Sequence, residues 1–384
     1  MAAVPTPFTV HLPEAELEEL RRRLDDIRWP LDPAGRDWSY GVGQEDLLEL
    51  CARWRDFEWR ATEQRINRMT HQQVVLDGHR IHVATVAPAG PSAGTVLLLH
   101  GWPSSFLEMI DLARELAIPN DGSQTAFTVV VPSLLGYGFS GPPPPEGFNR
   151  DQHAALLLDL MTALGHERFA VHAYDVSVSM GVRAALQSPE RVTAFHTTEP
   201  GLAAPWFSKE NQELRLTSEE STFLDYIERW EGDEGGYMAL QRTRPQTLAY
   251  GLSDSPVALA AWLYEKWRAW TVPQGGSWDG SLDDVLLATL TLYWATNTIS
   301  TANRMYAPPR TPHRTLTPED QLSQAVGVLL TSQEIERAPR SLVERVFPQL
   351  RHWTDLDRYG HFVCAEAPAE VAASLRLLLQ PARV

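Results

Sequence analysis

The chain has 384 residues, of which 43% are hydrophobic and 21% charged, a composition that favours a folded globular protein over a disordered one. Its formal net charge of −16 argues against nucleic-acid binding, because neutralising phosphates requires a basic face. With only two cysteines, Cys51 and Cys364, the chain has no disulfide framework and no thiolate metal cluster.

Membrane and export signals are missing from the sequence. No segment approaches the roughly 18 consecutive apolar residues of a membrane span. Residues 1–13 lack the basic start and the apolar run of a signal peptide. We therefore expect a soluble cytoplasmic protein with no membrane partner.

The first 72 residues predict a helical meander. Apolar residues recur at helical spacing from Leu17 to Ile27, and Pro30 ends that helix. A second amphipathic stretch covers residues 47–57. Because both apolar stripes need cover, we expect residues 1–72 to pack on the core and the cap described below.

Residues 73–204 predict the first part of an α/β core. Two strand-like stretches flank Asp77-Gly78, a pair typical of a β-hairpin turn. Short unbroken apolar runs follow, which suit parallel strands covered on both faces. These runs lie at residues 96–99, 127–131, 169–173 and, much later, 326–330. Helical stretches lie between the runs, so we predict an α/β fold with a mostly parallel, doubly wound sheet.

Residues 205–310 break this alternation of strands and helices. They are mostly helix-patterned and rich in tryptophan, with a capping box at Thr217 and Glu220 and a long helix at 257–270. The strand pattern then returns, so residues 311–384 are expected to complete the core. We predict that the helical insertion is a cap over the carboxyl edge of the sheet, where open α/β sheets bind ligands.

A buried strand runs directly into a helix through small residues between Phe169 and Gly181. This layout is that of a nucleophile elbow, whose strained turn raises one side chain above the sheet. Asp175 and Ser179 compete for that position. We favour Asp175 because Ser179 lies four residues further on, inside the expected helix. Taken alone, Asp175 would more simply be a helix cap.

Upstream, the stretch from His100 to Pro103 follows the strand at 96–99. A turn there can place the backbone N–H of Trp102 beside that of Val176, giving two donors for a developing oxyanion.

Taken together, these segments resemble the α/β-hydrolase-fold epoxide hydrolases, in the branch with an extra N-terminal region, like the microsomal enzymes. The resemblance covers nearly the whole chain. Its motifs lie at residues 8–13, 54–59, Asn67, 100–103, the elbow, the cap and Gly360-His361-Phe362. It implies an enzyme that converts an epoxide to a vicinal diol through a covalent ester on Asp175.

An ester intermediate must be hydrolysed, which requires a base and an orienting acid. The order of the fold, nucleophile then acid then histidine, together with the family motif, assigns His361 as the base. We favour Glu334 as the acid, just beyond the strand at 326–330. Asp355 and Asp357 remain alternatives, and Glu336 is a neighbour easily confused with Glu334.

Opening the epoxide also needs a proton donor, and a phenol suits this because it holds its proton at neutral pH. The family uses two cap tyrosines, and the matching segments here carry Tyr237 and Tyr306. For the other candidate tyrosines plain packing is the simpler interpretation; these are Tyr226, Tyr250, Tyr264 and Tyr293. We further predict that Met238 and Trp102 contact the substrate.

The elbow departs from the family pattern, which usually reads Gly-Gly-Asp-Trp-Gly. Here Val176 replaces the tryptophan, which removes an aromatic wall beside the nucleophile, and Tyr359 replaces the usual glycine before Gly360. Similar variant elbows, and an arginine bias, are associated with actinobacterial natural-product enzymes, including those of enediyne pathways. We therefore also predict a role in secondary-metabolite biosynthesis.

Three alternatives are kept beside this hypothesis. A haloalkane dehalogenase shares the aspartate nucleophile but commonly needs a tryptophan where Val176 stands. A serine esterase would use Ser179, and a binding protein of the same fold would use none of these groups.

No cofactor or metal is expected, since no further cluster has ligand spacing. The expected partner is a small-molecule epoxide, and an aryl group is compatible with the cap tryptophans Trp230, Trp262, Trp267 and Trp270. A homodimer is predicted from base rates alone.

Overall fold

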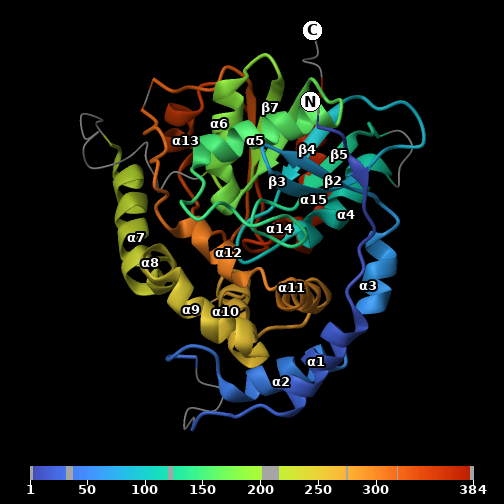
Figure 1. Cartoon of the computed structure of the whole chain (residues 1–384). Coiled ribbons are helices and arrows are strands. Elements are labelled where there is room, and N and C mark those ends of the chain that lie inside the picture. Colours follow the sequence, from blue (N-terminus) through green and yellow to red (C-terminus); the bar gives the residue numbers. More distant parts are fainter. Residues whose placement is uncertain are drawn as a thin grey trace.

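The computed structural model describes residues 3–31, 38–119, 124–200, 216–273, 276–317 and 319–380 (Figure 1). Within them, no helix is long and apolar enough to cross a lipid bilayer.

A nine-stranded sheet organises the molecule, with the strand order β1-β2-β3-β5-β4-β6-β7-β8-β9. The strands are β1 (Thr6–Pro7), β2 (Thr70–Leu76), β3 (His79–Val86), β4 (Thr95–Leu99), β5 (Thr128–Pro132), β6 (Phe169–Ala173), β7 (Val192–Thr197), β8 (Ala325–Leu330) and β9 (Leu350–Asp355). The first three pair antiparallel, β3 joins β5 antiparallel, and every pairing from β5 to β9 is parallel. The predicted mostly parallel sheet is therefore confirmed.

The predicted hairpin is β2–β3, and its turn is Asp77-Gly78. Both residues have positive φ, +48° and +82°, as the primed hairpin turns require. The strands β7 and β9 were not predicted. β7 mixes threonine and histidine with its apolar residues, and the edge strand β9 is largely polar, so neither forms an unbroken apolar run.

Helices cover both faces of the sheet, as a doubly wound fold requires. One face carries α4 (Ile110–Ala117), preceded by the 3-10 turn η1 (Phe106–Met109), together with α14 (Val363–Glu366) and α15 (Pro368–Leu379). The other carries α5 (Arg150–Ala163), α6 (Val178–Gln187) and α13 (Arg340–Val346). Each face has its own buried cluster, and the apolar runs of the parallel strands supply side chains to both.

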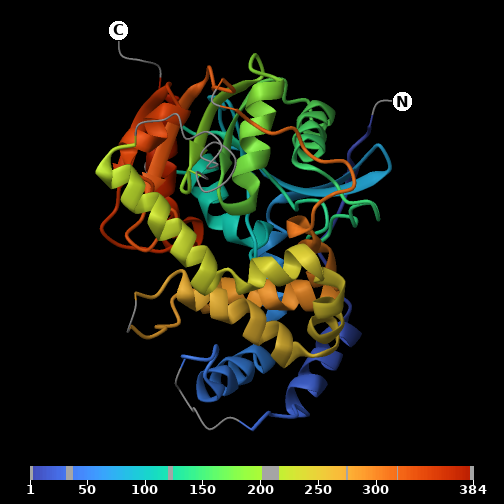
Figure 2. The ribbon, with the colours of Figure 1, turned by 90° about the vertical axis from the view of Figure 1, so that its left-hand side faces the viewer.

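Between β7 and β8 the chain forms a layer of helices that lies beside the sheet (Figure 2). Its elements are α7 (Ser218–Glu234), α8 (Gly236–Thr243), α9 (Pro245–Asp254), α10 (Pro256–Ala269), α11 (Asp283–Thr296), α12 (Ile299–Asn303) and the 3-10 turn η5 (Arg304–Tyr306). The predicted capping box is present: the Thr217 hydroxyl accepts from the Glu220 N–H, and the Glu220 carboxylate accepts from the Thr217 N–H. The helix predicted at 257–270 is α10.

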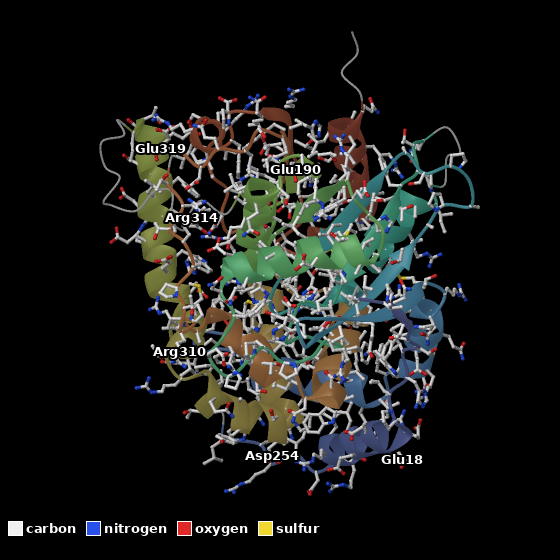
Figure 3. The ribbon with its side chains drawn as sticks, turned by 45° about the horizontal axis from the view of Figure 1, so that its top comes forward. Glu18, Glu190, Asp254, Arg310, Arg314 and Glu319 are labelled. Atoms are coloured by element: carbon white, nitrogen blue, oxygen red, sulfur yellow. The ribbon has the colours of Figure 1, made fainter. Side chains whose placement is uncertain are left out.

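The N-terminal helices α1 (Glu14–Asp25) and α2 (Gln44–Arg55) lie against the far side of these cap helices, and α3 (Trp59–Ile66) lies beside α11 and packs on the core (Figures 1 and 2). The apolar stripe of α1 is buried, and on α2 the indole of Trp54 donates a hydrogen bond of 2.9 Å to the Thr291 hydroxyl of α11. Charged residues such as Glu18, Asp254 and Glu319 lie at the periphery instead (Figure 3). The cap is thus enclosed by the sheet on one side and the N-terminal helices on the other.

Candidate active site

Asp175 lies directly beyond the end of β6, at the start of the 3-10 turn η2 (Asp175–Ser177) that leads into α6. Its φ of +52° is in the left-handed region, which non-glycine residues rarely occupy. Gly101 makes room for it, since a Cβ at that position would lie 2.6 Å from the Asp175 Cβ. The backbone therefore presents Asp175 as a strained elbow presents its nucleophile.

One oxygen of Asp175 is held by the predicted oxyanion donor. The backbone N–H of Trp102 donates to Asp175 Oδ1 at 2.8 Å. Val176, the second predicted donor, is the middle residue of η2 and lines the same cavity as Asp175. The first N–H groups of a helical turn have no partner within it, so this backbone has donors to offer an oxyanion.

His361 faces the other oxygen of Asp175. Its Nε2 lies 3.6 Å from Asp175 Oδ2, and its Nδ1 lies 2.9 Å from Glu334 Oε1. The imidazole and the Glu334 side chain are both fully buried. Burial alone would lower the pKa of His361, but the carboxylates of Glu334 and Asp175 outweigh it and raise the pKa well above its ordinary value.

Among the acids considered from the sequence, Glu334 is the one that contacts His361. Glu334 follows β8, and its Oε1 also accepts the Ile335 N–H at 2.8 Å, which orients the carboxylate. Asp355 is exposed and pairs instead with Arg337 and the Trp353 indole, and Asp357 is exposed as well.

Tyr237 and Tyr306 meet above the elbow and line one cavity together with Asp175. The ring of Tyr237 stacks on Trp102 with centroids 5.0 Å apart and planes 4° apart. Tyr306 approaches both rings edge-on, at 5.6 Å from Trp102 and 5.8 Å from Tyr237, and the two phenols are hydrogen-bonded. Burial raises the pKa of both phenols well above the ordinary value, so each keeps its proton at neutral pH.

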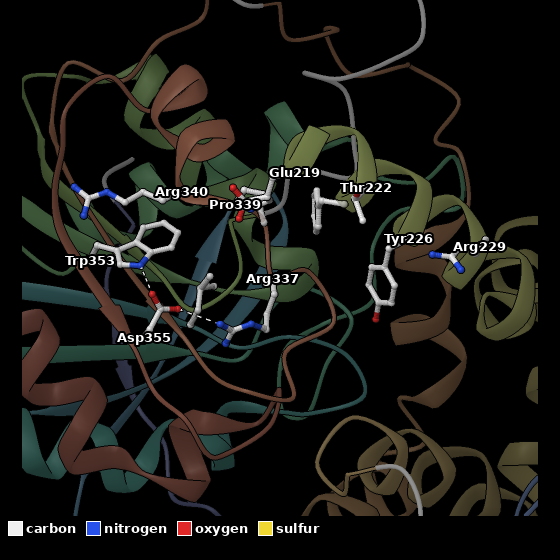
Figure 4. A pocket seen from close by; sticks show the side chains of 12 residues that line it. Glu219, Thr222, Tyr226, Arg229, Arg337, Pro339, Arg340, Trp353 and Asp355 are labelled. Atoms are coloured by element: carbon white, nitrogen blue, oxygen red, sulfur yellow. Dashed lines mark hydrogen bonds and ion pairs between the residues drawn. The ribbon is translucent and has the colours of Figure 1, made fainter. Parts of the chain in front are cut away.

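The other candidate tyrosines lie outside this cavity. Tyr250 is 72% exposed, Tyr264 packs edge-on against Trp38 and Trp278, and the Tyr293 hydroxyl donates to the Ser104 carbonyl. Tyr226 lines a different hollow of about 950 Å³, between α7 and the β9 edge of the sheet (Figure 4). The lining of that hollow contains the Arg337–Asp355 ion pair and none of the predicted catalytic residues.

The cavity at Asp175 has a volume of about 350 Å³, at the small end of the usual range for ligand pockets. Met238 lines it, as predicted, and so does Trp230. The other three cap tryptophans do not line it, and one of them, Trp267, is fully buried in a stack on Phe362. Ser179 also lines the cavity, but it lies within α6, past the turn that presents Asp175.

Glu199 is a carboxylate at this site that the sequence analysis missed. It lies just past the end of β7, is buried, and accepts the Asp175 N–H through Oε2 at 2.5 Å. Burial and the neighbouring acids Glu336 and Glu334 raise its pKa well above the ordinary value. The sequence could have pointed to Glu199 as an acidic residue that follows a strand adjacent to β6. It did not, because β7 was not predicted as a strand.

Asp175, Glu199 and His361 also form a group whose potential ligand atoms lie within 4.8 Å of one another. Each of the two carboxylates already accepts a backbone N–H through one oxygen. These bonds fix the orientation of both carboxylates.

The departure at Tyr359 has a structural consequence. Tyr359 has φ +71°, a left-handed conformation in which a glycine carries no steric cost. A glycine would adopt this conformation without strain, and the loop leading to His361 has a tyrosine in it instead.

The fold and the elbow define the class of the protein as an α/β-hydrolase that carries an aspartate at the nucleophile position. Residues 94–223 match the family described as alpha/beta hydrolase fold, and residues 5–109 match the family described as Epoxide hydrolase N terminus. The chain is 33% identical over 375 residues to a candidate epoxide hydrolase of Stigmatella aurantiaca, covering 97% of this chain and 84% of that protein. It is 28% identical to epoxide hydrolase 1 of Sus scrofa, covering 96% and 87%.

Solved structures agree with these sequence matches. The juvenile hormone epoxide hydrolase of Bombyx mori aligns with a TM-score of 0.83 at 26% identity, over 98% of this chain and 93% of that one. The Aspergillus niger epoxide hydrolase aligns with a TM-score of 0.83 at 26% identity, over 98% and 96%. The chain belongs to the epoxide hydrolase family, and its substrate is a small-molecule epoxide.

Proposed function

We propose that this enzyme opens its epoxide by covalent catalysis, with Asp175 as the nucleophile. The Trp102 N–H holds Oδ1, which leaves Oδ2 to attack. The Oδ2 lone pair forms a bond to one ring carbon while the bond from that carbon to the ring oxygen breaks. The ring oxygen takes the electron pair and receives a proton from Tyr237 or Tyr306, which becomes a phenolate.

Hydrolysis of the resulting ester is the second step. His361 Nε2 removes a proton from a water molecule, and the hydroxide adds to the ester carbonyl carbon. The negative charge develops on Oδ1, where the N–H groups of Trp102 and Val176 stabilise it. As the tetrahedral intermediate collapses, His361 returns its proton to the departing diol oxygen. The acid left on Asp175 gives its proton to the phenolate, which restores the starting state.

The charges around His361 favour this order of events. In the free enzyme, Asp175 and Glu334 together raise the pKa of His361 and keep the imidazole protonated. Alkylation turns Asp175 into a neutral ester and removes one of these carboxylates. The imidazole then releases its proton to the solvent more easily, so it becomes a base after the ester has formed. It takes a proton back from the solvent once the Asp175 carboxylate is restored.

The observation that carries this proposal is the placement of Asp175 between the Trp102 N–H at 2.8 Å and His361 Nε2 at 3.6 Å. A single turnover in oxygen-18 water tests it: the label should enter Asp175, and the first equivalent of diol should contain no oxygen from water. Label in the first equivalent of diol would show direct attack by water and contradict the covalent route.

A His361→Gln variant provides the second test. It should stop the reaction at the ester, so the intact protein should gain the mass of one substrate molecule. The Ser179→Ala variant should turn over normally and serves as the control. If the folded His361→Gln variant shows no gain in mass after incubation with substrate, this result would argue against an ester intermediate.

Trp230 in the lining of the cavity supports an aryl-bearing epoxide as the substrate, because a tryptophan face offers stacking to an aromatic ring. Chiral analysis of the diols from styrene-type and aliphatic epoxides of equal size would test this preference. The roles in secondary-metabolite biosynthesis and as a homodimer stay predictions from the sequence.

A further inference from the structure

One wall of the catalytic cavity is basic. Arg150 and Arg183 both line the cavity that contains Asp175, together with His313. Arg150 is the first residue of α5 and Arg183 lies in α6, so both guanidinium groups come from the core rather than from the cap. Neither residue takes part in the reaction proposed above.

The two arginines differ in how their charge is compensated. Arg183 is 2% exposed, donates to Asp151 Oδ1 at 2.7 Å and also donates to the Arg314 carbonyl at 2.8 Å. Arg150 donates only to the Met305 carbonyl, at 3.3 Å, and its Nη1 is buried without a hydrogen-bond partner. No carboxylate of the described residues lies within ion-pair distance of Arg150. Arg150 as a whole is partly exposed, but its Nη1 is buried, and none of the described carboxylates pairs with it.

A buried cation is costly unless an anion or several acceptors compensate it. The cost is visible in Arg150 itself, since burial lowers the pKa of its guanidinium. Asp175 contributes a favourable field but is not in contact, and its charge disappears when the ester forms. An anion brought by the substrate would supply the missing partner in both states, through charge-assisted hydrogen bonds of the planar guanidinium.

The position of Arg150 relates this anion to the reacting groups. The carbonyl that Arg150 donates to belongs to Met305, the residue before Tyr306, and the guanidinium is close enough to the Tyr306 phenol to interact with it electrostatically. Besides Asp175, the acidic side chains that line the cavity are Glu199, Glu231 and Glu336. Glu199 and Glu336 lie close to each other and to Glu334, whereas Arg150, Arg183 and His313 lie close to one another. The cavity thus contains a basic group of residues apart from the pair Glu199 and Glu336, with Asp175 acting on both.

We propose that the substrate is an epoxy acid whose carboxylate binds the Arg150 guanidinium while the epoxide ring lies between Asp175 and the two phenols. The inference rests on the proposed function of Asp175 and extends it to the class of substrate. Because a carboxylate is planar and has two acceptor oxygens, it matches the free Nη1 and its neighbouring nitrogens better than a neutral polar group does. A carboxylate close to the epoxide ring suits a cavity of about 350 Å³.

The test compares 3-phenylglycidate with 3-phenylglycidamide, which have the same shape and differ in charge. The wild-type enzyme should have the higher kcat/KM for the acid. Arg150→Gln should lower the acid-to-amide ratio of kcat/KM by about 10- to 100-fold, the usual effect of losing a charged hydrogen bond. Arg150→Lys should restore part of the ratio, because it returns the charge without the planar fork.

Arg191→Gln is the matched control. Arg191 also donates to backbone carbonyls, those of Glu167, Leu158 and His166, but it lies at the opposite end of β6 and does not line the cavity. Its substitution should leave the ratio unchanged. A wild-type enzyme that prefers the amide, or an Arg150→Gln variant that loses activity equally on both substrates, would overturn the inference. Such an equal loss would instead mean that Arg150 acts on Tyr306 or Asp175.

Inhibition of the wild-type enzyme gives a measurement that does not depend on the folding of a variant. With styrene oxide as the neutral substrate, cinnamate should inhibit competitively and at least tenfold more strongly than cinnamamide. Equal inhibition by the two would overturn the inference while leaving the epoxide chemistry intact. If styrene oxide, 3-phenylglycidate and 3-phenylglycidamide all gave no diol, the result would contradict the proposed function as well as the inference.

Discussion

The α/β core and the helical cap contribute different kinds of group and hold them in different ways. The core supplies Asp175, His361 and Glu334 from segments that follow strands or lead into helices on the sheet, and hydrogen bonds position each of them. The cap supplies Tyr237 and Tyr306, which are positioned mainly by ring packing. In the proposed mechanism the nucleophile and the base therefore come from the core, whereas the groups that protonate the leaving oxygen come from the cap.

Trp102 joins the two regions. Its backbone belongs to the core and donates to Asp175 Oδ1. Its ring lies under Tyr237, and its indole N–H donates to Asn303 in α12 at 3.0 Å. One residue therefore aligns the nucleophile of the core with a phenol of the cap.

Removing the proposed nucleophile, Asp175, tests the contribution of the core and has the largest expected effect. Asp175→Asn should lower kcat/KM for any epoxide by at least about 10,000-fold, because the amide does not attack and no other group replaces it. Steady-state diol formation measures the loss. Ser179→Ala, at the competing position, should stay within about threefold of the wild type. The opposite ranking of the two variants would move the nucleophile to Ser179.

Removing the phenols tests the contribution of the cap. Tyr237→Phe or Tyr306→Phe should each lower the rate of ester formation by about 10- to 100-fold, and the double variant by about 1,000-fold or more, since each phenol can support the loss of the other. Pre-steady-state alkylation, followed by intact-protein mass spectrometry, separates this step from hydrolysis. Tyr250→Phe, an exposed tyrosine of α9, is the matched control. Slower hydrolysis with unchanged alkylation would refute the division between core and cap.

Glu334 should affect ester hydrolysis rather than ester formation. Glu334→Gln should slow ester hydrolysis by about 100-fold, because the imidazolium that forms in that step loses its carboxylate partner. The same carboxylate raises the pKa of His361, so its loss should also move the acidic limb of the kcat–pH profile to lower pH. Glu336→Gln, two residues away, should leave that limb in place. An unshifted limb in Glu334→Gln would remove Glu334 from its proposed role.

The smallest expected effect concerns Glu199 and appears in stability. Its folded-state pKa is raised, so above the ordinary pKa near 4.5 the folded protein holds a proton that the unfolded chain has released, and the free energy of unfolding falls as the pH rises. Glu199→Gln keeps an oxygen for the Asp175 N–H and removes this penalty. It should therefore gain about 1 kcal/mol at pH 8 and less at pH 5, measured by urea unfolding. A gain that is equal at both pH values would contradict a raised pKa.

Several features of the fold and of the site could be predicted from the sequence, because each depends on residues that are close together in the chain. The turn at Asp77-Gly78, the apolar runs of the parallel strands and the capping box at Thr217 each depend on neighbouring residues, and the structure agrees with them. The elbow is local in the same sense, since a strand and a helix flank Asp175 directly.

Other features depend on strand order, which local patterns do not encode. Glu334 and Asp355 both lie near the ends of neighbouring strands. Only Glu334 contacts His361, whereas Asp355 forms an ion pair with Arg337 at the surface. Glu199 reaches Asp175 because β7 is the parallel neighbour of β6, and its strand was missed for lack of an unbroken apolar run.

By itself the sequence determined the type of fold and the kinds of chemical group available, because hydrophobic period and turn chemistry act over a few residues. Only the tertiary structure decided which carboxylate contacts the histidine, which cap tryptophan lines the cavity, and that Nη1 of Arg150 is buried without a partner among the described residues. These choices arise where parallel strands end at one edge and a helical layer closes over them, bringing together residues more than one hundred positions apart in the chain.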